Sequence, residues 1–392
     1  MPSPSFIRSI AANIAYWQQA TQNLTDETLP TIEQDRQNLY RAIEFGAQLE
    51  ETWRETAVLA LQCYPLIERR GYWHEWIPLL ERLRQAPGGD DLIVIGRLLN
   101  QLGIFYRYNH QLEKSLAAHW QEIELGRLMA DDWRLAHAHI NLAATNRELH
   151  QYDEAEQHAI AARDHFRIIK AAPIKFAFVA KEMGLIAQAR GQWDKAEAQQ
   201  RQAIALWREI NQPILLVESL RLLGQVLWKQ TRLDEALAIY QEALALLEAT
   251  DSELNKSRVF IDIGALYYDK GDWEKAEAYF LQADSPTMRY SGNLFAQAQL
   301  KGNLGNVYLM NGRLDKATSC LQQAITFWQQ TDDHLRLANA LGTLAEVHVA
   351  QGEAASAVPL LHQALTLLAD YPDDAWSQRL QTNFGRILAE IS

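Results

Sequence analysis

A small residue recurs at a nearly constant interval along most of this chain, and that interval limits its possible folds more than any other feature. Glycine or alanine follows an apolar residue at seven positions spaced 40 or 41 residues apart. The seven positions are Gly103, Ala143, Gly184, Gly224, Gly264, Gly305 and Ala345. A period of this length is the signature of a repeat array, in which each unit covers its apolar face by stacking on the next.

Each repeat encodes two helices. Apolar side chains return at three- and four-residue intervals on both sides of a short turn, which often contains a glycine such as Gly271 or Gly312. So short a connection forces the two helices into an antiparallel hairpin. A second recurring alanine, such as Ala236 or Ala276, lets the second helix approach the small residue of the first closely.

The repeat resembles the tetratricopeptide repeat, which has leucine, glycine and tyrosine in its first helix and alanines in its second. The segment Gly302-Asn303-Leu304-Gly305-Asn306-Val307-Tyr308 carries this pattern most clearly, and the resemblance covers roughly residues 91–371. It implies an all-α fold, a right-handed α-solenoid superhelix of antiparallel helical hairpins. The usual unit has about 34 residues. The longer unit here resembles the arrays of kinesin light chains, Leu-Gly-Asn-rich polarity adaptors and bacterial signal-transduction ATPases.

The chain divides into three parts at the sequence level. Residues 1–89 form an N-terminal helical region with one degenerate hairpin, residues 90–371 form seven repeats of about 40 residues, and residues 372–392 form a C-terminal capping helix. Pro87-Gly88-Gly89-Asp90 marks the first boundary. Outside the repeats, helices are expected over 6–22, 32–49, 51–69, 72–84 and 375–391.

The segment Asp35–Phe45 carries a second resemblance. It is similar to the segment that precedes the repeats in bacterial signal-transduction ATPases of the STAND (NB-ARC) type and in related transcription activators. In that family it joins a nucleotide-binding domain and a winged helix to a repeat sensor arm. This chain has no G-x-x-x-x-G-K-[ST] phosphate loop, so ATP binding is not carried over. The resemblance implies a sensor arm without the ATPase domain, either free-standing or excised.

Charge and cysteine content narrow the class of protein. The formal net charge of -12 disfavours a general nucleic-acid binder and an anionic membrane surface. Only two cysteines, Cys63 and Cys320, occur, which indicates no disulfide framework. The sequence has neither a signal peptide pattern nor a long apolar stretch, so we expect a cytoplasmic protein.

Catalytic and metal-binding motifs are not found. The sequence contains no H-E-x-x-H, C-x-x-C or G-x-S-x-G. His137 and His139 would point to different faces of a helix, and His158 and His165 share a face without further support for a metal site. We therefore expect no enzyme activity and no cofactor.

In tetratricopeptide arrays the first helices of successive hairpins line a concave groove, and the family's groove positions can be transferred residue by residue. The transferred positions are Arg97, Asn100, Arg107, Asn141, Arg147, Lys181, Arg221, Gln225, Trp228, Arg258, Tyr268, Asn303 and Asn306. Asparagine can both donate to and accept from a peptide backbone, and arginine can hold a carboxylate. However, Glu148, Glu182 and Asp262 stand at comparable positions, so these charges can also neutralise each other across neighbouring helices.

The sequence therefore predicts a non-catalytic scaffold or adaptor that binds a protein or peptide segment in the groove. The groove cations favour an acidic segment. Trp228 and Tyr268 are its best aromatic anchors, although packing between hairpins explains them equally well. The alternative function is a regulatory sensor arm that binds an inducer and signals to a separate ATPase or transcription regulator. Self-association through the array ends also stays open.

Overall fold

The fold consists of helices throughout the part of the chain that the structure describes. A computed structural model describes residues 2–22, 24, 28–70, 72–86, 91–248, 252–289, 294–331, 333–372 and 374–391. The break expected at Pro87–Asp90, and with it the boundary between residues 89 and 90, lies outside these residues. The predicted fold class, an all-α solenoid of antiparallel helical hairpins, is confirmed.

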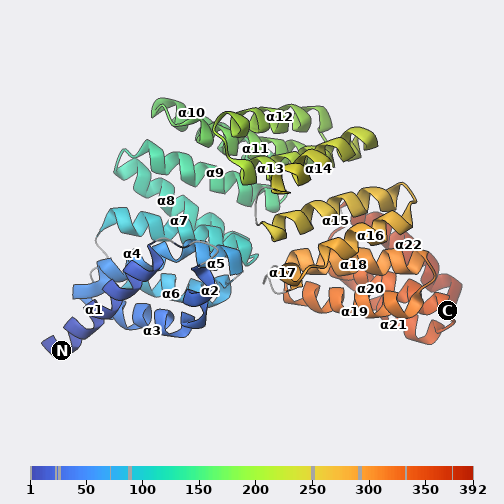
Figure 1. Cartoon of the computed structure of the whole chain (residues 1–392), viewed down its shortest axis with the longest axis horizontal. Helices are drawn as coiled ribbons and strands as arrows, with labels where there is room; N and C mark the ends of the chain where they lie inside the picture. Colours follow the sequence, from blue (N-terminus) through green and yellow to red (C-terminus); the bar gives the residue numbers. More distant parts are fainter. Residues whose placement is uncertain are drawn as a thin grey trace. The chain divides into compact units, whose positions relative to one another are not determined.

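The helices group into two compact units, residues 1–212 and residues 213–392, which we describe separately. Unit 1 holds three repeats (Figure 1). Their first helices are α7 (Leu92–Tyr108), α9 (Asp132–Glu148) and α11 (Pro173–Ala189), and their second helices are α8 (Leu112–Leu128), α10 (Tyr152–Ile168) and α12 (Trp193–Glu209). Each first helix packs against its own second helix, and successive first helices also touch.

Unit 2 holds four repeats and a final helix. The first helices are α13 (Pro213–Lys229), α15 (Glu253–Asp269), α18 (Leu294–Met310) and α20 (His334–Ala350). The second helices are α14 (Leu233–Glu248), α16 (Trp273–Ala283), α19 (Leu314–Gln330) and α21 (Ala354–Leu368), and the chain closes with α22 (Ala375–Ile391). α16 is shorter than the other second helices and is followed by a single turn, α17 (Pro286–Arg289). Pro286 explains the early end, because proline disfavours a helical conformation in the residue before it.

The recurring glycine makes room for a side chain of the second helix. A Cβ added at Gly224, Gly264 or Gly305 would come within 2.3 to 2.6 Å of a ring or side-chain carbon of the facing residue. The facing residues are Tyr240, Phe280 and Leu321, each sixteen positions after its glycine and fully or almost fully buried. The period in the sequence thus records a knob-and-socket contact inside each hairpin.

Turns and caps repeat with the helices. A residue with positive φ ends each first helix, and glycine fills the position at Gly191, Gly271, Gly312 and Gly352. The other three repeats place His110, His150 and Thr231 there, with φ of 54°, 61° and 62°. Several first helices begin at an aspartate whose carboxylate accepts backbone N–H groups, as Asp131 does from Arg134 at 3.0 Å.

The N-terminal helices differ in detail from those expected. They are α1 (Pro4–Thr21), α2 (Leu29–Gln34), α3 (Arg36–Gly46), the 3-10 turn η1 (Glu50–Thr52), α4 (Trp53–Gln62), α5 (Tyr64–Arg70) and α6 (Trp73–Gln85). The helix expected over 32–49 is interrupted at Asp35, where the backbone leaves helical geometry, and the one expected over 51–69 is interrupted at Cys63. Pro65 accounts for the second break, because it has no N–H to continue the ladder. These helices share one apolar core with α7.

The final helix, α22, follows the register of a first helix. Gly385 stands 40 residues after Ala345, and α22 packs against both α21 and α20, as a next first helix would. Phe384 fills the space above Gly342 of α20, and Ile387 joins the same apolar core. A Cβ at Gly385, in contrast, would meet nothing within 4 Å. The outward side chains of α22 are polar, including the exposed Arg379, Thr382 and Arg386.

Candidate functional site

The first helices of each unit lie next to one another, and their shared side forms what we call the first-helix face. In unit 1 this face is built by α7, α9 and α11, and in unit 2 by α13, α15, α18, α20 and α22. All eight helices are 17 residues long, so equivalent side chains recur at equivalent heights. The residues predicted from the sequence lie on these helices.

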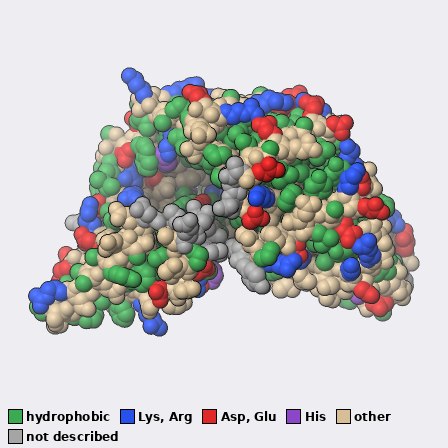
Figure 2. Space-filling model, viewed as in Figure 1, with side chains coloured by type: hydrophobic (Ala, Val, Ile, Leu, Met, Phe, Trp, Pro, Cys, Tyr) green, Lys and Arg blue, Asp and Glu red, His purple; other side chains and the backbone are tan. Residues whose placement is uncertain are grey.

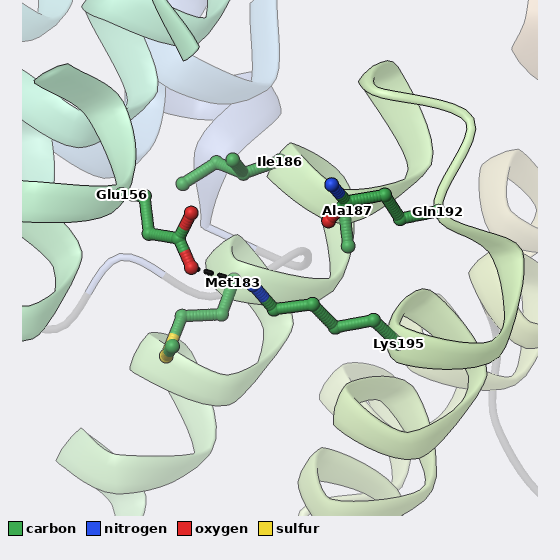
Figure 3. A pocket seen from close by; sticks show the side chains of 6 residues that line it. All are labelled: Glu156, Met183, Ile186, Ala187, Gln192 and Lys195. Atoms are coloured by element: carbon green, nitrogen blue, oxygen red, sulfur yellow. Dashed lines mark hydrogen bonds and ion pairs between the residues drawn. The ribbon is translucent and has the colours of Figure 1, made fainter. Parts of the chain in front are cut away.

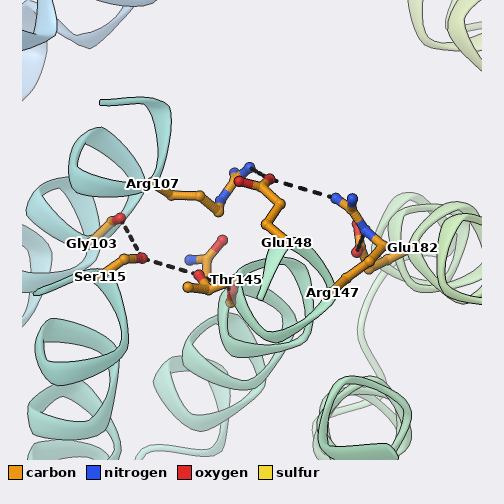
Figure 4. Close-up of polar contacts among 8 residues, drawn as sticks. Gly103, Arg107, Ser115, Thr145, Arg147, Glu148 and Glu182 are labelled. Atoms are coloured by element: carbon orange, nitrogen blue, oxygen red, sulfur yellow. Dashed lines mark hydrogen bonds and ion pairs between the residues drawn. The ribbon is translucent and has the colours of Figure 1, made fainter. Parts of the chain in front are cut away.

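In unit 1 two of the three predicted arginines, Arg107 and Arg147, belong to a chain of ion pairs across three repeats (Figure 4). Arg107 of α7 donates to Glu148 of α9 at 2.9 Å, and Arg147 of α9 donates to Glu182 of α11 at 2.7 Å. Arg147 also lies 3.7 Å from Glu148, which joins the two pairs. The Glu182 side chain is only 9% exposed, so its charge depends on Arg147 for compensation.

Burial and ion pairing shift the pKa of these two arginines in opposite directions. Burial is the largest single influence and lowers the pKa of Arg107, but Glu148, Tyr108 and Glu182 together raise the pKa overall. The pKa of Arg147 is raised in the same way, against burial, by Glu182. Both guanidinium groups therefore stay charged and already have a counter-charge within the protein.

Unit 2 repeats this arrangement with other residue types. Arg221 of α13 donates to Asp262 of α15 at 2.6 Å, and Gln225 donates to the other oxygen of the same carboxylate at 3.1 Å. Trp228 donates its indole N–H to Asp269 at 3.0 Å. Burial is the largest single influence and lowers the pKa of Arg221, but the charge and hydrogen bond of Asp262, together with Tyr240 and Glu218, raise the pKa overall. Trp228 is thus a bridge between two first helices as well as a half-exposed aromatic.

Some predicted residues make local contacts within their own unit. Asn100 donates to both oxygens of Glu122, a buried carboxylate of α8, at 3.2 Å each. The Lys181 ammonium lies 5.5 Å from the ring centre of Phe178. Tyr268 is half-buried, and burial raises the pKa of its hydroxyl. Arg258, on α15, also interacts with other residues of the protein.

Four predicted residues remain available to a partner. Arg97 is exposed and forms no ion pair with any residue that the structure describes. The side-chain amides of Asn141, Asn303 and Asn306 are half-buried and have no hydrogen-bond partner within the described part of the chain. Asn303 and Asn306 are three residues apart on α18, so they lie on the same side of that helix.

One polar contact of the face was not foreseen. Asn383 of α22 donates to Glu346 of α20 at 2.8 Å. Burial raises the pKa of Glu346, and the hydrogen bond from Asn383 partly offsets this rise. The signal in the sequence was the register of Gly385, since Asn383 stands two residues before it, where Asp262 stands before Gly264. The final helix therefore extends the first-helix face of unit 2.

Among the described residues, the depressions that can be outlined are either closed or wide open to solvent, and no metal cluster is formed. The depression lined by Glu156, Met183, Ile186, Ala187, Gln192 and Lys195 is too small inside to admit water, and an ion pair of 2.5 Å between Lys195 and Glu156 crosses it (Figure 3). Within the described ranges, no group of three or more His, Cys, Asp or Glu side chains is arranged to hold a metal ion. Over the same ranges, no helix has the length and apolar character needed to span a membrane.

Charged side chains of both signs are interspersed on the visible surface, without a face of single sign (Figure 2).

Comparison with known families identifies the repeats. The tetratricopeptide repeat family matches residues 176–249, 215–283 and 296–370. The gap between the last two matches coincides with the stretch between α16 and α18, which contains α17.

Two curated proteins are similar in sequence. The 43 kDa receptor-associated protein of the synapse from Tetronarce californica is 20% identical over 312 residues, which cover 79% of this chain. Protein KINESIN LIGHT CHAIN-RELATED 2 from Arabidopsis thaliana is 24% identical over 272 residues, or 66% of this chain. The matched regions span 64% and 41% of those two proteins.

Solved structures support the same fold. A signal transduction ATPase with a tetratricopeptide repeat sensor from Pyrococcus horikoshii superposes with a TM-score of 0.57 at 16% identity, covering 90% of this chain and 55% of that one. A Rap protein complexed with competence and sporulation factor gives 0.56 at 16% identity, covering 86% and 100%. The quorum sensor NprR from B. thuringiensis gives 0.51 at 12% identity, covering 83% and 99%. The repeats within residues 176–370 thus match the tetratricopeptide repeat family, and the solved structures share the fold of the whole array.

Proposed function

We propose that this protein is a non-catalytic scaffold that binds an extended segment of a partner protein along the first-helix face of unit 2. The observation that carries the proposal is the pair Asn303 and Asn306 on α18. Both amides are half-buried and without an internal partner in the described residues, whereas the neighbouring Arg221 and Asp262 are already paired. An amide can donate and accept at once, which suits the alternating groups of a peptide backbone.

The ion pairs of the first-helix face limit which partner segments we expect to bind. Arg107, Arg147 and Arg221 each already face a carboxylate, so an acidic segment would have to displace a partly buried counter-charge. We therefore propose that hydrogen bonds to the peptide backbone, more than acidity, determine binding. Tyr268, on the first-helix face of the same unit, supplies an aromatic surface for an apolar side chain of the partner.

Affinity capture with a matched control tests this proposal. The double variant Asn303→Ala/Asn306→Ala removes both amides, and we expect recovery of the bound partner to fall about tenfold or more, at roughly 1 kcal/mol for each lost hydrogen bond. The control Gln322→Ala/Gln329→Ala removes two exposed amides from α19, the second helix of the same repeat. Partners would be identified by mass spectrometry, and circular dichroism would verify the fold of each variant. Equal recovery with the two double variants would refute the proposal.

A second candidate function is a sensor arm that binds a small inducer and signals to a separate effector. It is supported by the extent of the similarity to the Pyrococcus ATPase, whose sensor consists of tetratricopeptide repeats, and by the similarity to NprR, a quorum sensor. Thermal-shift screening with short peptides and with small metabolites separates the two functions, because a ligand that binds only the folded state raises the melting temperature. A shift with short free peptides that disappears in Asn303→Ala/Asn306→Ala would favour the sensor arm. Capture of a protein without any such shift would favour the scaffold.

A further inference from the structure

Three histidines meet where α9 packs against α10, and we call them the histidine joint: His139, His158 and His165. The Nδ1 atoms of His139 and His158 are 3.0 Å apart, and the two ring centres are 5.1 Å apart. The ring of His165 stacks on His139 with a centre-to-centre distance of 5.6 Å and an angle of 11° between the planes. Nδ1 of His165 in turn lies 2.7 Å from the Asp132 carboxylate.

This geometry limits the number of protons that the joint can hold. A hydrogen bond between two Nδ1 atoms needs an N–H on one ring and a lone pair on the other. The contact between His139 and His158 therefore survives while at least one of these two rings is neutral. A second proton places two N–H groups face to face, and two cations at this separation repel each other strongly in a half-buried site.

Charged side chains from α8, α9 and α10 face the joint. Arg127 of α8 adds a positive charge beside His139, and Glu154 of α10 partly offsets the effect of burial on His158. Asp132 of α9 is engaged by His165, and the Trp120 ring of α8 meets His158 edge-on without adding charge. The surroundings of His139 thus contain more positive than negative charge.

A neighbouring contact, between His137 of α9 and Lys175 of α11, is also sensitive to protonation. His137 accepts a hydrogen bond from the Lys175 ammonium of α11 at Nε2, 2.9 Å away, while its Nδ1 donates to the carbonyl of Trp133 at 2.7 Å. Both ring nitrogens are used, and the Lys175 contact requires a lone pair on Nε2. Protonation of His137 would therefore set two cations against each other between α9 and α11.

We propose that the histidine joint is an acid-sensitive contact, and that release of α10 from α9 becomes progressively easier as the pH falls from neutral toward about 4. The release would loosen α9, which also carries Arg147 and Glu148 of the first-helix face. The inference concerns the stability of unit 1 and does not depend on the function proposed for unit 2.

The direction of the pH effect follows from the burial of the rings. Burial, followed by the charges of His158, His165 and Arg127, lowers the pKa of His139 to about 4, and burial also lowers the pKa of His158. Burial likewise lowers the pKa of His137 to about 4. The unfolded chain then binds protons first as the pH falls. The contribution to stability is complete above about pH 6.5, the ordinary histidine pKa, and is lost as the pH falls toward about 4.

Thermal unfolding of the full chain at several pH values, with a chelator present to exclude bound metal, tests the proposal. In the double variant His139→Gln/His158→Gln, glutamine keeps a hydrogen-bonding group but cannot take up a proton. Between about pH 7 and about pH 5, we expect the melting temperature of the wild type to fall by several degrees more than that of the double variant. The control is His74→Gln, which changes an exposed histidine on α6 of the same unit and should behave as the wild type.

An NMR titration of the wild-type histidine side chains gives a test that does not depend on the variant folding. The resonance of His139, assigned by its disappearance in His139→Gln, should titrate well below the ordinary midpoint, near pH 4. The opening free energy of α9 and α10, obtained from amide exchange after correction for the intrinsic pH dependence of exchange, should fall as the pH drops from about 6.5 toward about 4. A His139 midpoint at or above about 6.5, or an unchanged pH dependence in the double variant, would overturn the proposal.

Discussion

Thr231 occupies the turn position at which the three following repeats have glycine. Its φ of 62° is unfavourable for a β-branched residue, at a cost of about 1–2 kcal/mol. We expect Thr231→Gly to raise the free energy of unfolding by about 0.5–1 kcal/mol, because glycine's freedom in the unfolded chain removes part of the gain. Chemical denaturation would measure the change. The reverse substitution, Gly271→Thr, should destabilise the protein, and a less stable Thr231→Gly would contradict this account.

The ion pair between Arg147 and Glu182 makes the second prediction at the residue scale. Arg147→Met leaves the Glu182 carboxylate, 9% exposed, without its partner and should lower the free energy of unfolding by about 2–3 kcal/mol. Adding Glu182→Leu should recover most of that loss, because both charges are then gone. Arg167→Met serves as the control, since its pair with Asp164 is exposed and should contribute less than about 0.5 kcal/mol. Urea unfolding curves distinguish these outcomes.

The sequence predicted which residues lie on the first-helix face, but not which of them form ion pairs with each other. Arg107 and its partner Glu148 are 41 residues apart, whereas Arg147 and Glu182 are 35 apart. The two arginines stand four residues after the small residue of their repeats, but the carboxylates stand at different positions, five residues after Ala143 and two before Gly184. The pairing therefore depends on where the next first helix carries an acid and on the side-chain conformation, which the repeat period does not specify.

At the scale of helices, a crowded glycine, Gly342, and an uncrowded one, Gly385, test the packing of α22 against α20. A Cβ at Gly342 of α20 would come within 1.9 Å of the Phe384 ring, so Gly342→Ala should overpack the contact and lower the free energy of unfolding by about 1–3 kcal/mol. Gly385→Ala places the same methyl group in open space and should raise it by about 0.5–1 kcal/mol, as alanine favours helix. Equal effects in thermal unfolding would rule out the packing described for α22.

Helix positions were predictable inside the repeats and less so outside them. The spacing of the small residues placed every first helix, and the final helix over 375–391 agrees with α22. The N-terminal region lacks this period, so hydrophobic patterning alone joined α2 to α3 and α4 to α5. Pro65 was a local signal for the second break, but Asp35 carries no comparable one.

At the scale of the whole molecule, the array should respond to damage locally. Within each unit, every repeat contacts its sequence neighbours, so the stability of a repeat is close to the sum of its own folding free energy and the free energies of its interfaces. Gly264→Leu, which overpacks α15 against Phe280, should raise hydrogen exchange most in α15 and α16, less in α13 and α18, and least in α22. Exchange measured by mass spectrometry checks this order. A uniform increase across unit 2 would show that it unfolds as a single cooperative body instead.

Gly385 has a consequence for engineering. It is a vacant socket of the kind that Tyr240, Phe280 and Leu321 fill elsewhere, presented in the correct register on an existing helix. A synthetic second helix fused after α22, with a large apolar residue sixteen positions beyond Gly385 and a glycine at the turn, would have a ready-made seat. Designed hairpins could therefore be appended to the array after α22, one at a time.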